Sequence, residues 1–149
     1  MSKSVYSRPA KGSHLATIQY EIDMLNYCYQ TLASRDRQWD PAWGNPKNAY
    51  ICLESFLLHY RNLVEFFGSA EDLKVTEPKL WVPEGRHLTI DEIDSISDRK
   101  LCEKYRGEIS AYLQHCTKKR ANVDRSWDVG EMNKEIQPLI ARFHDLFPW

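Results

Sequence analysis

Apolar residues recur at alternating steps of three and four along four segments of this chain. This spacing places them on one face of an α-helix. In residues 13–34 the stripe consists of Leu15, Ile18, Ile22, Leu25, Tyr29 and Leu32. Comparable stripes occur in residues 46–68, 98–118 and 129–146, and no segment shows a strand pattern. The sequence therefore predicts an all-α four-helix bundle, with the first two and the last two helices forming hairpins.

Local signals predict where these helices begin and end. Pro46 suits the first position of the second helix, and Gly68 is expected to end it. Asp128 and Glu131 have the spacing of a capping box at the start of the fourth helix. Pro138 lies within that helix, so we expect a kink there or a break one residue earlier.

The stretch 68–98 is predicted to be a long irregular connection across the end of the bundle. Pro78, Pro83 and Gly85 interrupt any regular element in it. Near its end, Thr89 and Glu92 again match a capping box, which predicts a short helix starting there.

Length and composition indicate one soluble domain. The 149 residues are 42% hydrophobic, which suffices for a core in a single domain 1–149, with 1–12 as a flexible tail. No run approaches the roughly 20 apolar residues of a membrane span, and no secretory signal is visible, so we expect a cytoplasmic protein. Twenty basic and 21 acidic residues give a net charge of −1, which argues against a broadly basic nucleic-acid surface but not against a local patch.

The cysteines do not form a metal-binding pattern. Cys28, Cys52, Cys102 and Cys116 are widely spaced, and the chain has no CxxC or HExxH motif. We expect reduced, mostly buried thiols, and neither a metal nor a cofactor.

The second helix is apolar on two sides. Most of its large side chains share one face, but Ile51, Leu58 and Phe66 point the other way. A helix of this kind is either central in the fold or part of a subunit interface. We therefore predict a homodimer interface at these three residues.

Polar residues form two further stripes on the same helix. One is uncharged and indicates a partly buried, hydrogen-bonded seam: Asn48, Ser55, His59 and Asn62. The other indicates a salt-bridged exposed edge: Glu54, Arg61 and Glu65. His59 is then either a core histidine with satisfied hydrogen bonds or a catalytic group.

A basic cluster follows the third helix. His115 lies close to a run of cations that comprises Lys118, Lys119, Arg120 and, farther on, Arg125. Cations are favoured at a helix C-terminus, so simple helix termination is one interpretation. The other is a phosphate-contacting patch for RNA or a nucleotide, with His115 as acid or base.

Two segments resemble a known group of proteins. Residues 53–67, LESFLLHYRNLVEFF, resemble a helix of small uncharacterised bacterial proteins with the pattern E-S-F-x-x-H-x-R-N-L-x-x-F-F. Residues 109–117, ISAYLQHCT, followed by Lys119, Arg120 and Trp127, resemble the later I-x-x-x-L-x-H-L-T helix of that group. The two segments cover about a sixth of the chain. The group in turn resembles the HEPN superfamily of helical bundles.

The resemblance implies a helical bundle, often dimeric. Many HEPN proteins are metal-independent ribonucleases of toxin–antitoxin and antiphage systems, and others are non-catalytic RNA- or nucleotide-binding modules. The ribonucleases carry Arg, four to six further residues and then His, whereas Arg61 here is followed by Phe66, Phe67 and Gly68 where the histidine is needed. The usual motif is absent, so a catalytic version would use another constellation, with His59, Arg61 and His115 as its candidate residues.

Three hypotheses follow. The first is a HEPN-like binding or assembly module that forms a homodimer and contacts RNA or a nucleotide. The second is a metal-independent ribonuclease of toxin or antiphage-defence type with a non-standard site. The third is a structural subunit that binds another protein without nucleic acid.

Overall fold

The computed structural model describes residues 14–34, 46–69, 88–113 and 126–147, and all regular elements in these ranges are helices. This confirms the all-α prediction. The elements, in chain order, are α1 (His14–Ala33), α2 (Pro46–Val64), the π-helical turn η2 (Glu65–Ser69), α3 (Ile90–Ile96), α4 (Arg99–Leu113) and α6 (Val129–Leu146). The tail predicted for residues 1–12 and most of the 68–98 connection lie outside the described residues.

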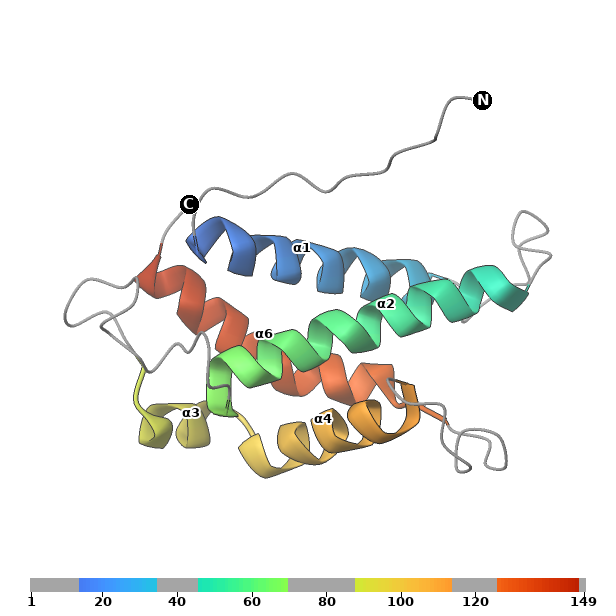
Figure 1. Cartoon of the computed structure of the whole chain (residues 1–149). Coiled ribbons are helices and arrows are strands. Elements are labelled where there is room, and N and C mark those ends of the chain that lie inside the picture. Colours follow the sequence, from blue (N-terminus) through green and yellow to red (C-terminus); the bar gives the residue numbers. More distant parts are fainter. Residues whose placement is uncertain (1–13, 35–45, 70–87, 114–125, 148–149) are drawn as a thin grey trace, which may run out of the picture.

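The long helices pack side by side with alternating direction. In Figure 1, α1 and α2 form an antiparallel hairpin, α2 crosses in front of α6, and α4 lies along the lower side of α2. The short helix α3 packs against η2 and α6 at the end of the molecule where α1 begins. α2 therefore lies between α1 and α4 and contacts both.

One core receives side chains from every helix. Its fully buried members include the largest aromatic side chains of α2, η2 and α6, with aliphatic residues around them: Tyr60, Phe56, Phe67, Phe143, Ile22, Leu25, Leu57, Leu63, Ile93, Ile109 and Met132. Phe56 stacks on Tyr60, and Tyr60 meets Tyr105 of α4 edge-on. Apart from Ile93 of α3, these residues belong to the predicted helical stripes, so the apolar periodicity is satisfied within the chain.

The predicted N-caps are confirmed at Thr89 and Asp128, each by the half of the capping box in which the cap side chain accepts a backbone N–H. The Thr89 hydroxyl accepts the backbone N–H of Glu92 at 3.2 Å, and the Asp128 carboxylate accepts that of Glu131 at 2.9 Å. α6 continues through Pro138, so the predicted break does not occur. Proline removes one backbone hydrogen bond there, but the buried Ile136 and Leu139 anchor both halves of the helix in the core.

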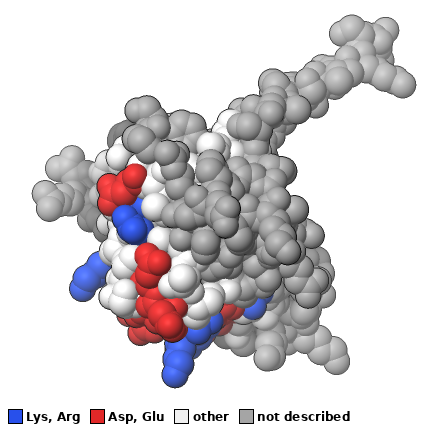
Figure 2. Space-filling view, turned by 90° about the vertical axis from the view of Figure 1, so that its left-hand side faces the viewer, with Lys and Arg blue, Asp and Glu red and all other residues white. Residues whose placement is uncertain are grey.

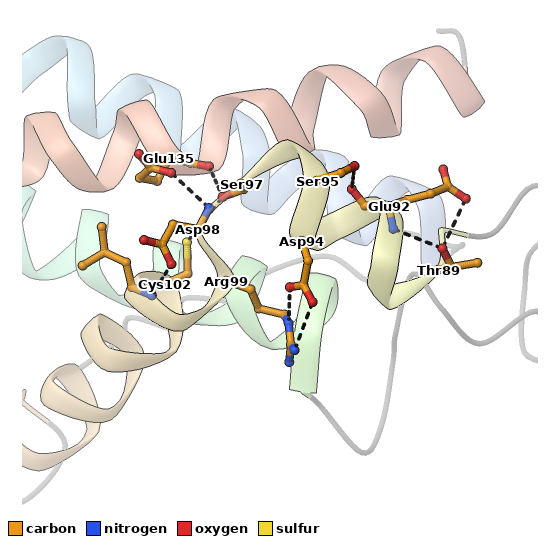
Figure 3. A network of polar contacts seen from close by, with 10 residues as sticks. Thr89, Glu92, Asp94, Ser95, Ser97, Asp98, Arg99, Cys102 and Glu135 are labelled. Atoms are coloured by element: carbon orange, nitrogen blue, oxygen red, sulfur yellow. Dashed lines mark hydrogen bonds and ion pairs between the residues drawn. The ribbon is translucent and has the colours of Figure 1, made fainter.

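A polar network joins α3, α4 and α6 (Figure 3). The Ser97 hydroxyl donates to the backbone carbonyl of Glu135 at 2.6 Å, and the Asp98 N–H donates to the Glu135 carboxylate at 3.2 Å. Arg99 pairs with Asp94 at 2.6 Å and thereby lowers the pKa of that carboxyl group. The network fixes the sharp turn between α3 and α4 onto α6.

The three predicted interface residues do not share one environment. Ile51 is 63% exposed and Leu58 is 45% exposed, whereas Phe66 is only 2% exposed. The prediction for Phe66 is wrong because α6 covers this side of the helix: Phe66 meets Phe143 edge-on at 5.7 Å between ring centroids. The outward face of α2 therefore carries Ile51 and Leu58 but ends before η2.

Within the described ranges, none of the helices has the length and apolar character needed to cross a membrane.

Candidate functional site

A buried polar pair joins α1 to α2. His59 Nδ1 lies 2.5 Å from the Glu21 carboxylate, and the Asn62 side chain donates to the same carboxylate oxygen at 3.1 Å. His59 is only 5% exposed, and Glu21 is buried as well. The predicted hydrogen-bonded seam is confirmed at His59 and Asn62, and we call the group Glu21, His59 and Asn62 the seam cluster.

Glu21 was not among the candidate residues of the sequence, although a signal for it exists. It follows Ile18 by three positions and precedes Leu25 by four, so it occupies a core position of the α1 stripe. A carboxylate at such a position requires a partner, because an unpaired buried charge is strongly disfavoured. That partner comes from a different helix, and the α1 sequence does not identify it.

The seam cluster fixes the orientation of the histidine ring. The carboxylate at Nδ1 favours a proton on that nitrogen and leaves Nε2 as the potential base. Tyr20 meets the ring edge-on, with centroids 5.8 Å apart. Such an arrangement suits general base chemistry, but burial of the imidazole limits the approach of a substrate.

Arg61 lies on the opposite flank of α2. Its Nε donates to the Ser110 hydroxyl of α4 at 3.1 Å, and its Nη2 pairs with Glu65 at 3.1 Å. Arg106 of α4 approaches the same Glu65 oxygen at 3.8 Å. The predicted salt bridge is thus confirmed at Arg61 and Glu65, but both side chains are half-buried and not exposed as expected. Because residues two positions apart on a helix diverge by about 200°, Arg61 and His59 face different neighbours and do not form one site.

The other predicted site residues follow α4 in the chain. His115, Lys118, Lys119, Arg120 and Arg125 lie outside the described residues. In the part of the chain that is described, no three His, Cys, Asp or Glu side chains gather as metal ligands would. On the face in Figure 2, the described basic and acidic side chains are interspersed.

Two of the described cysteines have the character of structural thiols, while Cys52 is half-buried. Cys28 and Cys102 are buried. Burial raises the pKa of the Cys102 thiol, which disfavours the nucleophilic thiolate. Burial also raises the pKa of the neighbouring Tyr60 hydroxyl. Neither group is suited to act as a nucleophile.

A small groove opens between α2 and α4. It has a volume of about 160 Å³ and is lined by Glu54, Leu58, Ile109 and Leu113. Leu58 is at the same time an exposed side chain on the rim, and Glu54 is exposed beside it. We call this feature the α2–α4 groove. It adjoins the outward face of α2 at Leu58.

Two candidate features therefore emerge from the described residues. One is the seam cluster, which is chemically apt but buried. The other is the outward face of α2 with the adjoining α2–α4 groove, which is accessible and apolar. Comparison of the chain with protein-family models, curated proteins and solved structures finds no match to any of them.

Proposed function

We propose that this chain is a HEPN-like four-helix-bundle module whose function is assembly, and that it forms a homodimer through the outward face of α2. The observation that carries the proposal is the exposure of Ile51 and Leu58 on a helix whose other side forms the core. Two exposed apolar residues seven positions apart lie two turns apart along one side of a helix.

Two apolar side chains do not bury enough surface for a stable dimer. Burying one such side chain contributes roughly 1.5–3 kcal/mol, while a stable interface covers about 800 Å² on each partner. The rest of the area has to come from the surroundings of Leu58, which include the α2–α4 groove and the charged edge of α2. An interface of this composition has an apolar centre and a polar rim, as is typical of protein–protein contacts.

Two observations favour assembly over catalysis. His59 is buried and bound to Glu21, and Arg61 is turned toward α4 and bound to Ser110 and Glu65. Both side chains have intramolecular partners that account for their presence without a substrate.

Sedimentation equilibrium of the full chain tests the proposal. We expect a mass of two chains for the wild type and of one chain for Leu58→Asp, because a carboxylate would be desolvated in the interface. Ile90→Asp is the matched control, since Ile90 is 37% exposed but lies on α3. It is expected to remain dimeric. A wild type that stays monomeric at all concentrations would refute the homodimer.

A second candidate function is a metal-independent ribonuclease of toxin or antiphage-defence type with a non-standard site. The Glu21 carboxylate at His59 Nδ1 is the observation that favours it. The test is RNA cleavage in EDTA by the wild type, His59→Ala, Glu21→Gln and His115→Ala, each checked for helical content. If the wild type cleaves RNA and a His59→Ala or His115→Ala variant with normal helical content does not, catalysis would replace assembly as the proposed function. Equal cleavage in all four would indicate a contaminating nuclease.

A further inference from the structure

The α2–α4 groove lies beside Leu58, a side chain of the size that would fill the same groove on a second copy of the chain. Leu58 lines the groove and is also 45% exposed, so it belongs to both the depression and the projecting rim. An apolar cavity of roughly 150 Å³ accommodates a benzene-sized group, and the groove has about 160 Å³. One leucine side chain therefore fits in it.

A knob and a hole on the same face favour a second copy of the same chain. In a two-fold interface each subunit presents the same patch, so that what one copy inserts the other copy receives. This patch carries both features at Leu58, as a two-fold interface requires.

The charges along α2 are self-complementary in the same way. Glu54 and Arg61 lie on the same edge of α2, two helical turns apart, and the midpoint between them falls between Leu57 and Leu58. Each is about 5 Å along the helix from that midpoint, given a rise of 1.5 Å per residue. A two-fold axis through the midpoint, perpendicular to the helix, places Glu54 of one copy opposite Arg61 of the other, twice.

We infer that a second copy docks antiparallel across α2, with Leu58 of each copy in the α2–α4 groove of the other and with two reciprocal Glu54–Arg61 pairs beside it. The inference rests on the proposed homodimer and specifies its register. Arg61 already binds Glu65 and Ser110, but a guanidinium has five N–H donors in a fixed fork and can bind a further carboxylate. The rim charges then select the register, while Leu58 supplies the apolar centre.

A charge-swap experiment on the full chain tests this register. Glu54→Lys alone places like charges at both pairs of its homodimer, and so does Arg61→Glu alone. We expect each variant to have a dimer dissociation constant at least about tenfold above that of the wild type at low salt. An equimolar mixture restores opposite charges at both pairs, so we expect a heterodimer of near wild-type affinity, measured by sedimentation and by native mass spectrometry.

Asp145→Lys is the matched control, because it reverses an exposed carboxylate on α6. It is expected to dimerise as the wild type does, and circular dichroism checks that all variants fold. If either single variant dimerises like the wild type, or if the mixture fails to recover, the register is wrong. In those cases a dimeric wild type and a monomeric Leu58→Asp would still support the homodimer. A monomeric wild type would overturn both the register and the proposed function.

Discussion

At the scale of single residues, Tyr60 presents an unusual arrangement. The side chain is fully buried between aromatic rings, yet its hydroxyl has no hydrogen-bond partner among the residues that the structure describes. After burial, the neighbouring Cys102 thiol contributes most to the raised pKa of Tyr60, and a thiol is a weak hydrogen-bond partner. A buried hydroxyl without a good partner is destabilising by roughly 1–3 kcal/mol.

We therefore expect Tyr60→Phe to leave stability unchanged or to increase it by up to about 1 kcal/mol, since the ring packing stays and the unpaired hydroxyl is removed. Urea unfolding monitored by circular dichroism measures the change. Tyr60→Leu is the contrasting variant and should be destabilised through lost packing. A clear loss of stability in Tyr60→Phe would mean that the hydroxyl is well bonded in solution.

Tyr105 predicts a dependence of stability on alkaline pH. Burial, and after it the hydrogen bond that its hydroxyl donates to Glu131, raise the pKa of Tyr105 to about 12. An unfolded tyrosine ionises near pH 10, so between about pH 10 and 12 the unfolded chain releases a proton that the folded chain keeps. Stability is full below about pH 10 and falls above it.

The fall in the urea midpoint between pH 8 and pH 11 should accordingly be smaller in Tyr105→Phe than in the wild type. Some slope remains, because burial raises the pKa of Tyr60 in the same direction. Tyr27→Phe, a change at an exposed tyrosine of α1, is the control and should keep the wild-type slope. Identical slopes for all three proteins would contradict the assignment to Tyr105.

At the scale of elements, the α1–α2 hairpin depends on the seam cluster. The Glu21–His59 pair, with Asn62 on the same carboxylate, is a buried polar contact between α1 and α2, and both helices also contribute apolar core residues, among them Ile22, Leu25 and Phe56. Removing one member of a buried pair leaves the other buried without a partner and lowers stability. Replacing both by apolar groups often changes stability little. We therefore expect the pair to serve the specificity of the hairpin more than its stability.

A double-mutant cycle tests this role. We expect Glu21→Leu and His59→Leu each to lower the free energy of unfolding by about 3 kcal/mol. The loss in the double variant should be smaller than the sum of the two single losses by at least about 2 kcal/mol. The free energy of unfolding from urea titrations at pH 7 gives the coupling. Additive losses would show that the two side chains act independently.

At the scale of the whole molecule, the outward face of α2 links stability to concentration. If the folded chain dimerises and the unfolded chain does not, mass action stabilises the dimer as protein concentration rises. The wild-type Tm should therefore increase over a hundredfold range of concentration, measured by differential scanning fluorimetry and calorimetry. The Leu58→Asp Tm should stay constant over the same range, and a constant Tm in the wild type would contradict the homodimer.

Local sequence determined most of the secondary structure. The helical stripes, the capping boxes at Thr89 and Asp128 and the salt-bridged edge at Arg61 follow from spacings of three, four and seven residues, which a helix satisfies by itself. Pro138 was ambiguous, because whether a helix survives a proline depends on how firmly both halves are anchored elsewhere.

Tertiary structure alone decided the partners of these side chains. Glu21 could be recognised as a carboxylate at a core position, but its pairing with His59 depends on the register of α1 against α2. Phe66 pointed away from the α2 stripe, and only the course of α6 explains why it is buried. Periodicity and capping act within a few residues of one helix, whereas burial and pairing depend on which helix lies opposite, and that depends on the packing of the whole chain.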